Sequence, residues 1–137
     1  MKRQLSIKAF TIMEIMIVVI IVGIIAAFAI PNYSRSVSQS HLQDAMMQLS
    51  AIRSANQVYY ARTSKYWPAT AAANNVTAIN SFLSLNIIEN AMTYSCTGIA
   101  SGATFNCTAT PVGSAYTVTV TQNVLSSTNP TCGGTCP

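Results

Sequence analysis

The hydrophobic positions of this chain fall into three regions that differ in spacing. Residues 15–30 form one unbroken apolar run, and eleven of them are Ile, Val or Phe. In residues 33–62 apolar side chains recur at steps of three and four, which is the spacing of an amphipathic helix. In residues 92–121 they recur at steps of two, which is the spacing of half-buried strands. The pattern therefore predicts a long helix followed by a small sheet.

The apolar run predicts the first half of one helix over about residues 10–62. From Phe10 to Ile30, at about 1.5 Å per residue, this helix covers roughly 31 Å, enough to cross the hydrocarbon core of a bilayer. Pro31 lacks an N–H group, so we expect it to kink the helix as it leaves the membrane. Pro68 disfavours helix at the residue before it, so the helix is expected to end near residues 64–68.

The second half of this helix is expected to dock on a globular head. Its apolar stripe, which Asn56 interrupts, consists of Leu42, Ala45, Leu49, Ile52 and Tyr59. Four aromatic residues near its end are most simply packing residues at the junction of helix and head: Tyr59, Tyr60, Tyr66 and Trp67. Residues 69–90 are expected to connect helix and sheet, with a loop over 69–75 and then a short helix carrying Val76, Ile79, Phe82 and Leu83.

Three runs with alternating side chains predict the sheet, at residues 92–97, 104–109 and 116–121. The breaks between them, residues 100–103 and 111–114, contain turn-forming Gly, Pro and Ser. We expect an antiparallel meander with its apolar face on the helix stripe and its Thr face outward. The predicted fold class is therefore α+β, one long N-terminal helix packed on a small antiparallel sheet.

The four cysteines allow three pairings. If Ile99 faces Thr104 across the first turn, then Cys96 faces Cys107 directly, which leaves Cys132 to pair with Cys136 in a tight terminal loop. A crossed pairing, with the tail joined to the sheet, stays open. The spacings leave ten and three residues between neighbouring cysteines, unlike the short pairs of zinc knuckles, so no metal is expected.

Charge is scarce and unevenly placed. The net charge is +4, but Lys2, Arg3 and Lys8 precede Phe10, and from Phe10 onward four basic residues face three acidic ones. Residues 66–137 contain Glu89 as their only charged side chain, which argues against nucleic-acid binding by the head. With His41 as the only histidine, the chain offers no catalytic constellation and no cofactor site, so no enzyme is expected.

Glu14 lies inside the apolar segment. A carboxylate in the middle of a bilayer costs about 2.5–3.5 kcal/mol on insertion scales, and such residues normally mark function with a specific partner. The side chains of the apolar run offset this cost, so the segment should still insert. The basic residues ahead of it should stay cytoplasmic, with everything after Ile30 outside the inner membrane.

These N-terminal residues resemble the type IV pilin superfamily. The resemblance rests on the basic leader, Ala9, the sequence Phe-Thr-Ile-Met-Glu at residues 10–14, the apolar run and Ile-Pro-Asn-Tyr at 30–33. It implies that a prepilin peptidase cuts between Ala9 and Phe10, that the new amine of Phe10 is methylated, and that the mature helix packs in a filament core. The family nearly always has Gly before the cut, where this chain has Ala9.

The resemblance also implies an organisation. Residues 1–9 are the leader, residues 10–31 the membrane and filament-core half of the helix, and residues 32–137 the head with the amphipathic half. The subunit would lie in the inner membrane and then, through the pilus assembly machinery, in a cell-surface filament with other pilins. After cleavage the amine of Phe10, its own or a neighbour's, becomes the partner of Glu14. Pro31 and the stretch back to Gly23 would let the helix loosen in a filament, or merely kink it.

The implied function is that of a structural pilus subunit supporting motility, adhesion or DNA uptake. The alternatives are a minor pilin, a periplasmic type II secretion pseudopilin, or a head specialised for binding surfaces or DNA. Major pseudopilins tend to bind calcium near the C-terminus through carboxylates, and no Asp or Glu follows Glu89. Pilins commonly close a C-terminal loop with a disulfide, which keeps the crossed cysteine pairing open.

Overall fold

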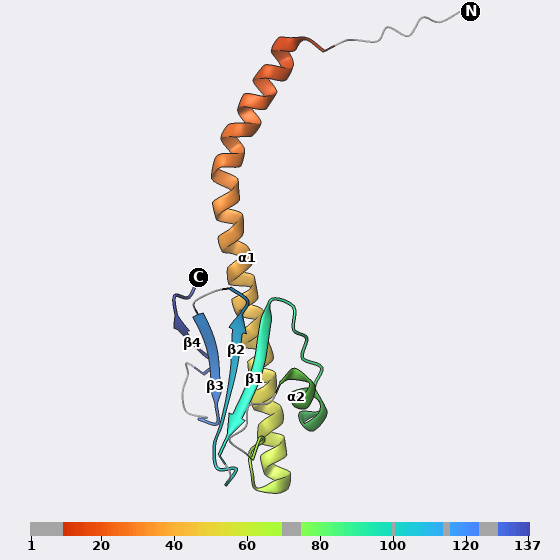
Figure 1. Ribbon diagram of the computed structural model, residues 1–137, viewed down its shortest axis with the longest axis vertical. Coiled ribbons are helices and arrows are strands. Elements are labelled where there is room, and N and C mark those ends of the chain that lie inside the picture. Colours follow the sequence, from red (N-terminus) through yellow and green to blue (C-terminus); the bar gives the residue numbers. More distant parts are fainter. Residues whose placement is uncertain (1–9, 70–74, 100, 114–115, 124–128) are drawn as a thin grey trace, which may run out of the picture. The chain divides into compact units, whose positions relative to one another are not determined.

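The computed structural model describes residues 10–69, 75–99, 101–113, 116–123 and 129–137. The elements are α1 (Ile12–Thr63), α2 (Val76–Leu83), β1 (Met92–Gly98), β2 (Phe105–Pro111), β3 (Tyr116–Thr121) and β4 (Thr131–Gly134), shown in Figure 1. The chain divides into two compact units, residues 1–37 and 38–137. The predicted long helix, short helix and three strands are confirmed. The expected leader, with Ala9, and most of the expected loop at 69–75 lie outside the described residues.

The four strands form one antiparallel sheet in the order β1-β2-β3-β4 (Figure 1). The register places Cys96 opposite Cys107, as the alternation predicts. We expected residues 132–136 to form a tight terminal loop, but residues 131–134 pair with β3 as the edge strand β4. Two of the four residues of β4 are Gly, so its side chains show no alternation; main-chain pairing with β3 determines this strand.

The core of the second unit lies between α1 and the inner face of the sheet. From α1 it buries Ala45, Leu49, Ile52 and Asn56. Burial of a Leu or Ile side chain contributes about 1.5–3 kcal/mol. Three alternate residues in each of the first three strands face the same core: Met92, Tyr94, Cys96, Phe105, Cys107, Ala109, Tyr116, Val118 and Val120. The intervening, mostly Thr, positions are more exposed, which confirms the predicted orientation of the sheet.

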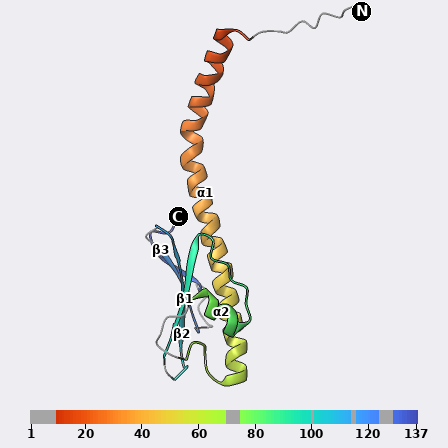
Figure 2. The ribbon, with the colours of Figure 1, turned by 45° about the vertical axis from the view of Figure 1, so that its right-hand side comes forward.

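Helix α2 closes one side of the core. It begins at Asn75, whose side chain accepts a hydrogen bond from the N–H of Ala78 at 3.1 Å, a standard N-cap. Its buried residues are Ile79 and Leu83. In both views α2 lies beside β1 and the C-terminal half of α1 (Figures 1 and 2).

The aromatic residues at the end of α1 and just after it pack as predicted. The rings of Tyr60 and Tyr66 stack with centroids 4.4 Å apart, and Tyr66 contacts Phe105 at 5.2 Å. Trp67 is buried and stacks on Phe82 of α2 at 5.6 Å. Such pairs contribute about 0.5–1.5 kcal/mol beyond burial of their area, so this cluster fixes the chain where it turns from α1 towards the sheet.

Candidate assembly site

The first turn of α1 is capped by Thr11 and Glu14. The N–H of Glu14 donates to Oγ1 of Thr11 at 3.2 Å, and Oε2 of Glu14 accepts from the N–H of Thr11 at 3.3 Å. The hydroxyl of Thr11 lies 3.4 Å from the same carboxylate oxygen. This reciprocal arrangement is a capping box, in which a Thr before the helix and a Glu three residues later satisfy two free main-chain donors.

The capping role of Thr11 is a feature that sequence reasoning missed. The signal was present, because Thr-x-x-Glu ahead of an apolar run is the usual sequence form of a capping box. The charge of Glu14 alone does not reveal this role. In the structure Oε2 of Glu14 caps the helix N-terminus, and no hydrogen bond from a described residue reaches Oε1.

Phe10 lies immediately before this cap. Its side chain is 78% exposed, and it precedes Glu14 by four residues. Ala9, the other residue of the expected cleavage position, is outside the described residues. The main-chain nitrogen of Phe10 lies two residues before Ile12, the first residue of α1, and four residues before Glu14.

The surface that follows Glu14 is apolar on all sides. Each Ile, Val, Met and Phe side chain in residues 15–30 is between 50% and 71% exposed in the single chain. Among the described residues, α1 is the one helix whose length and composition suffice to cross a membrane. A helix that is hydrophobic all round requires an apolar environment, either lipid or other helices.

Pro31 lies inside α1, which remains helical on both sides of it. Because Pro31 has no N–H, it cannot bond the carbonyl oxygen of Ala27. One residue further on, the side-chain amide of Asn32 donates to the carbonyl oxygen of Phe28 at 3.2 Å. One main-chain hydrogen bond of α1 is therefore missing at Ala27, within the segment from Gly23 to Pro31.

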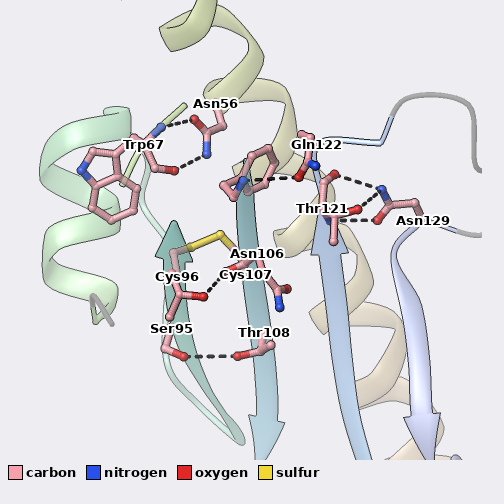
Figure 3. Close-up of a disulfide and its surroundings, with 12 residues drawn as sticks. Asn56, Trp67, Ser95, Cys96, Asn106, Cys107, Thr108, Thr121, Gln122 and Asn129 are labelled. Carbon is pink, nitrogen blue, oxygen red and sulfur yellow. Dashed lines mark hydrogen bonds between the residues drawn. A yellow bond between two sulfur atoms is a disulfide. The ribbon is translucent and has the colours of Figure 1, made fainter. Parts of the chain in front are cut away.

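The predicted cysteine sites lie in the second unit, away in sequence from the N-terminal residues. Cys96 and Cys107 form a disulfide between β1 and β2, and both are fully buried (Figure 3). Cys132 and Cys136 form a second one across the end of β4. The structure thus contains the pairing that the strand register favours and not the crossed pairing. Within the described ranges, no three His, Cys, Asp or Glu side chains are grouped so as to hold a metal ion.

Comparison with known proteins agrees with this arrangement. The chain is 33% identical over 104 residues to the fimbrial protein EcpC of Eikenella corrodens, covering 69% of this chain and 67% of EcpC. It is 37% identical over 59 residues to the type IV major pilin PilA of Myxococcus xanthus. The chain belongs to the type IV pilin family. A fimbrial protein of Pseudomonas aeruginosa is also similar to this pilin, at 44% identity over 55 residues.

The match to most relatives is confined to part of the chain. This pilin covers 27% of the length of the Myxococcus protein and 34% of the Pseudomonas protein. No family model matches the chain, and no solved structure matches it. Its apolar N-terminal helix fits a membrane-anchored pilin, and its α+β architecture is that of a type IV pilin.

Proposed function

We propose that this pilin is a structural subunit of a type IV pilus filament that assembles through the first half of α1. The observation that carries the proposal is the carboxylate of Glu14 at the head of a helix whose apolar side chains are exposed on every side. In a bundle of such helices the apolar surfaces cover one another. The carboxylate must then be neutralised, because an unpaired buried charge is strongly destabilising.

The amine of Phe10 is the partner that we propose for Glu14. Cleavage between Ala9 and Phe10 by a prepilin peptidase would create this cation, and methylation would retain its charge. Within one chain the carboxylate already caps α1 through Thr11. Pairing with the amine of a neighbouring subunit would add a second, intermolecular contact, which fixes the axial position of one helix against the next.

Residues 10–31 would also serve in membrane anchoring and in transfer of the subunit into the filament. Before assembly, residues 10–31 would anchor the subunit in the inner membrane with the leader in the cytoplasm and residues 32–137 outside. The assembly machinery would then transfer the apolar helix from lipid into the filament, which emerges at the cell surface. The missing hydrogen bond ahead of Pro31 would let the stretch from Gly23 loosen during this transfer.

The test separates the charge of Glu14 from its capping role. Glu14→Gln keeps an acceptor for the N–H of Thr11, since Glu and Gln both serve in capping boxes, but it removes the charge. Thr11→Ala removes the cap and keeps the charge. Both variants are produced in a piliated host that lacks its own pilin gene. Leader removal is then followed by N-terminal sequencing and subunit content by quantifying sheared filaments.

We expect Glu14→Gln to be cleaved normally and to be almost absent from filaments, whereas Thr11→Ala is incorporated at a substantial level. Normal incorporation of Glu14→Gln would refute the pairing with Phe10. The amount of unsubstituted chain in the sheared fraction is informative by itself. An abundant subunit is a major pilin, a trace subunit is a minor pilin, and absence from any pilus fraction favours a secretion pseudopilin.

A further inference from the structure

The head carries one acidic and one basic side chain on the same outward face of α1. Asp44 and Arg62 are 18 residues apart. At 3.6 residues per turn this is five turns, so the two side chains point in the same direction, about 27 Å apart along the helix axis. Both side chains are exposed.

Neither charge is neutralised by a residue that the structure describes. One oxygen of Asp44, Oδ2, accepts from the side-chain amide of Gln48 at 2.9 Å, a neutral donor. The charge of Asp44 also raises the pKa of Tyr94, whose neutral hydroxyl does not neutralise it. Arg62 has no hydrogen bond or ion pair with any described residue. By contrast Arg53, another cation of α1, donates to the carbonyl oxygen of Asn123 at 2.8 Å. Asp44 and Arg62 are therefore available to groups outside the chain.

The face between the two charges is apolar. Ala51 and Val58 are exposed on it, and Val58 retains 54% of its accessible surface. Next to Arg62 the face widens into a groove of about 370 Å³ between α1 and α2, where Phe82 is 60% exposed. The face thus carries a negative charge at one end and a positive charge at the other, so the opposite ends of two parallel copies are complementary.

We propose that this face of α1 is a contact between successive subunits, in which Asp44 of one copy pairs with Arg62 of the next. The inference rests on the proposed filament function and adds an outer contact to the one at Phe10 and Glu14. In a filament all subunits have the same orientation, so the contact joins the Asp44 end of this face in one subunit to the Arg62 end in the next and repeats without closing. The pair then relates neighbouring helices by an axial offset of about five turns, or about 27 Å.

Charge reversal tests the pair in the full chain. Asp44→Arg or Arg62→Asp alone places like charges together at the interface, which should lower the yield of sheared filaments by roughly tenfold or more. The double variant restores opposite charges and should recover most of the yield. The matched control combines Asp44→Arg with Lys65→Asp, which reverses the neighbouring cation beyond the end of α1. This control should not restore filaments.

Cysteine cross-linking tests the geometry. The four native cysteines are paired in disulfides. The variant with both Asp44→Cys and Arg62→Cys should therefore give a ladder of dimers, trimers and higher species in oxidised filaments, while either single variant stays monomeric. Dimers alone would mean a closed antiparallel pair, and monomers in intact filaments would mean that the two positions do not meet. Either result overturns the proposal.

The proposed function and this inference fail differently. If the unsubstituted chain is absent from filaments, the filament function itself is wrong. If the unsubstituted chain forms filaments and the single reversals do so equally well, only the contact between Asp44 and Arg62 is wrong. Equal amounts of processed subunit in the membranes of all variants show that a lower yield reflects assembly and not folding.

Discussion

The side-chain amide of Asn56 bonds both main-chain groups of Trp67. It donates to the carbonyl oxygen at 2.5 Å and accepts from the N–H at 2.8 Å (Figure 3). Each amide of this kind supplies the donor and the acceptor that a strand partner would otherwise provide. The head has few charged side chains, and neutral Asn side chains provide hydrogen-bond partners for these main-chain groups. The same two-bond arrangement joins Asn80 to Ile87 and Asn129 to Thr121.

Replacing Asn56 with Ala should destabilise the head strongly. Asn56 is fully buried, so the substitution leaves the N–H and the carbonyl group of Trp67 without partners in the interior. Each unsatisfied buried group costs about 1–3 kcal/mol, and we expect a loss of about 2–4 kcal/mol in the free energy of unfolding. Urea unfolding of the full chain in detergent, followed by the fluorescence of its single Trp, measures this loss.

The matched control for Asn56→Ala is Gln43→Ala, an exposed amide on the same helix. Its free energy of unfolding should change by less than about 0.5 kcal/mol, as for most surface substitutions. If both variants unfold at the same urea concentration as the unsubstituted chain, the amide of Asn56 does not hold Trp67 in place.

Gly98, the last residue of β1, should not tolerate a side chain. A Cβ atom at this position would lie 1.8 Å from the carbonyl oxygen of Pro68, which is main chain and cannot rotate away. We expect Gly98→Ala to cost about 3 kcal/mol or more, at the upper end of overpacking. Gly133→Ala is the control, because its Cβ would lie 3.9 Å from the nearest atom. Equal urea midpoints for the two variants would show that β1 does not approach Pro68 this closely.

The sheet could largely be predicted from the sequence, because a period of two determines the face of each strand and the position of the first turn determines the register. Cys96 lies opposite Cys107 for that reason. The edge strand β4 could not be predicted in this way, since Gly133 and Gly134 carry no pattern and main-chain pairing determines it. Asn56 seemed from its spacing to interrupt the apolar stripe of α1. It is buried in that stripe, because its partner Trp67 comes from a turn that spacing along the helix does not reveal.

At the candidate site, too, some features could be predicted from the sequence and others could not. The cost of a charge in an apolar segment singles out Glu14 from the amino-acid sequence alone. The sequence pattern does not reveal which side chains from separate segments meet in the interior. It therefore does not reveal which buried polar groups lack a partner, and Tyr94 of β1 is an example. Its side chain is 3% exposed, and its hydroxyl has no hydrogen-bond partner among the described residues.

Tyr94 should make the stability of the head depend on alkaline pH. Burial, then the charge of Asp44 and then that of Glu89, raise the pKa of Tyr94 from 10.0 to about 12. The folded chain therefore holds this proton more tightly than the unfolded chain. The resulting stability is fully present below pH 10.0 and is lost as the pH rises towards about 12.

Tyr94→Phe removes the proton and the unpartnered hydroxyl together. Near neutral pH this variant should be as stable as the unsubstituted chain or more stable by about 1 kcal/mol, because a buried donor without a partner is removed. Urea midpoints measured from about pH 8 to about pH 11 should then fall less steeply for Tyr94→Phe than for the unsubstituted chain. The exposed Tyr33 gives the control, since Tyr33→Phe should keep the full pH dependence. Parallel curves for Tyr94→Phe and the unsubstituted chain would mean that the Tyr94 hydroxyl ionises as readily in the folded chain as in the unfolded one.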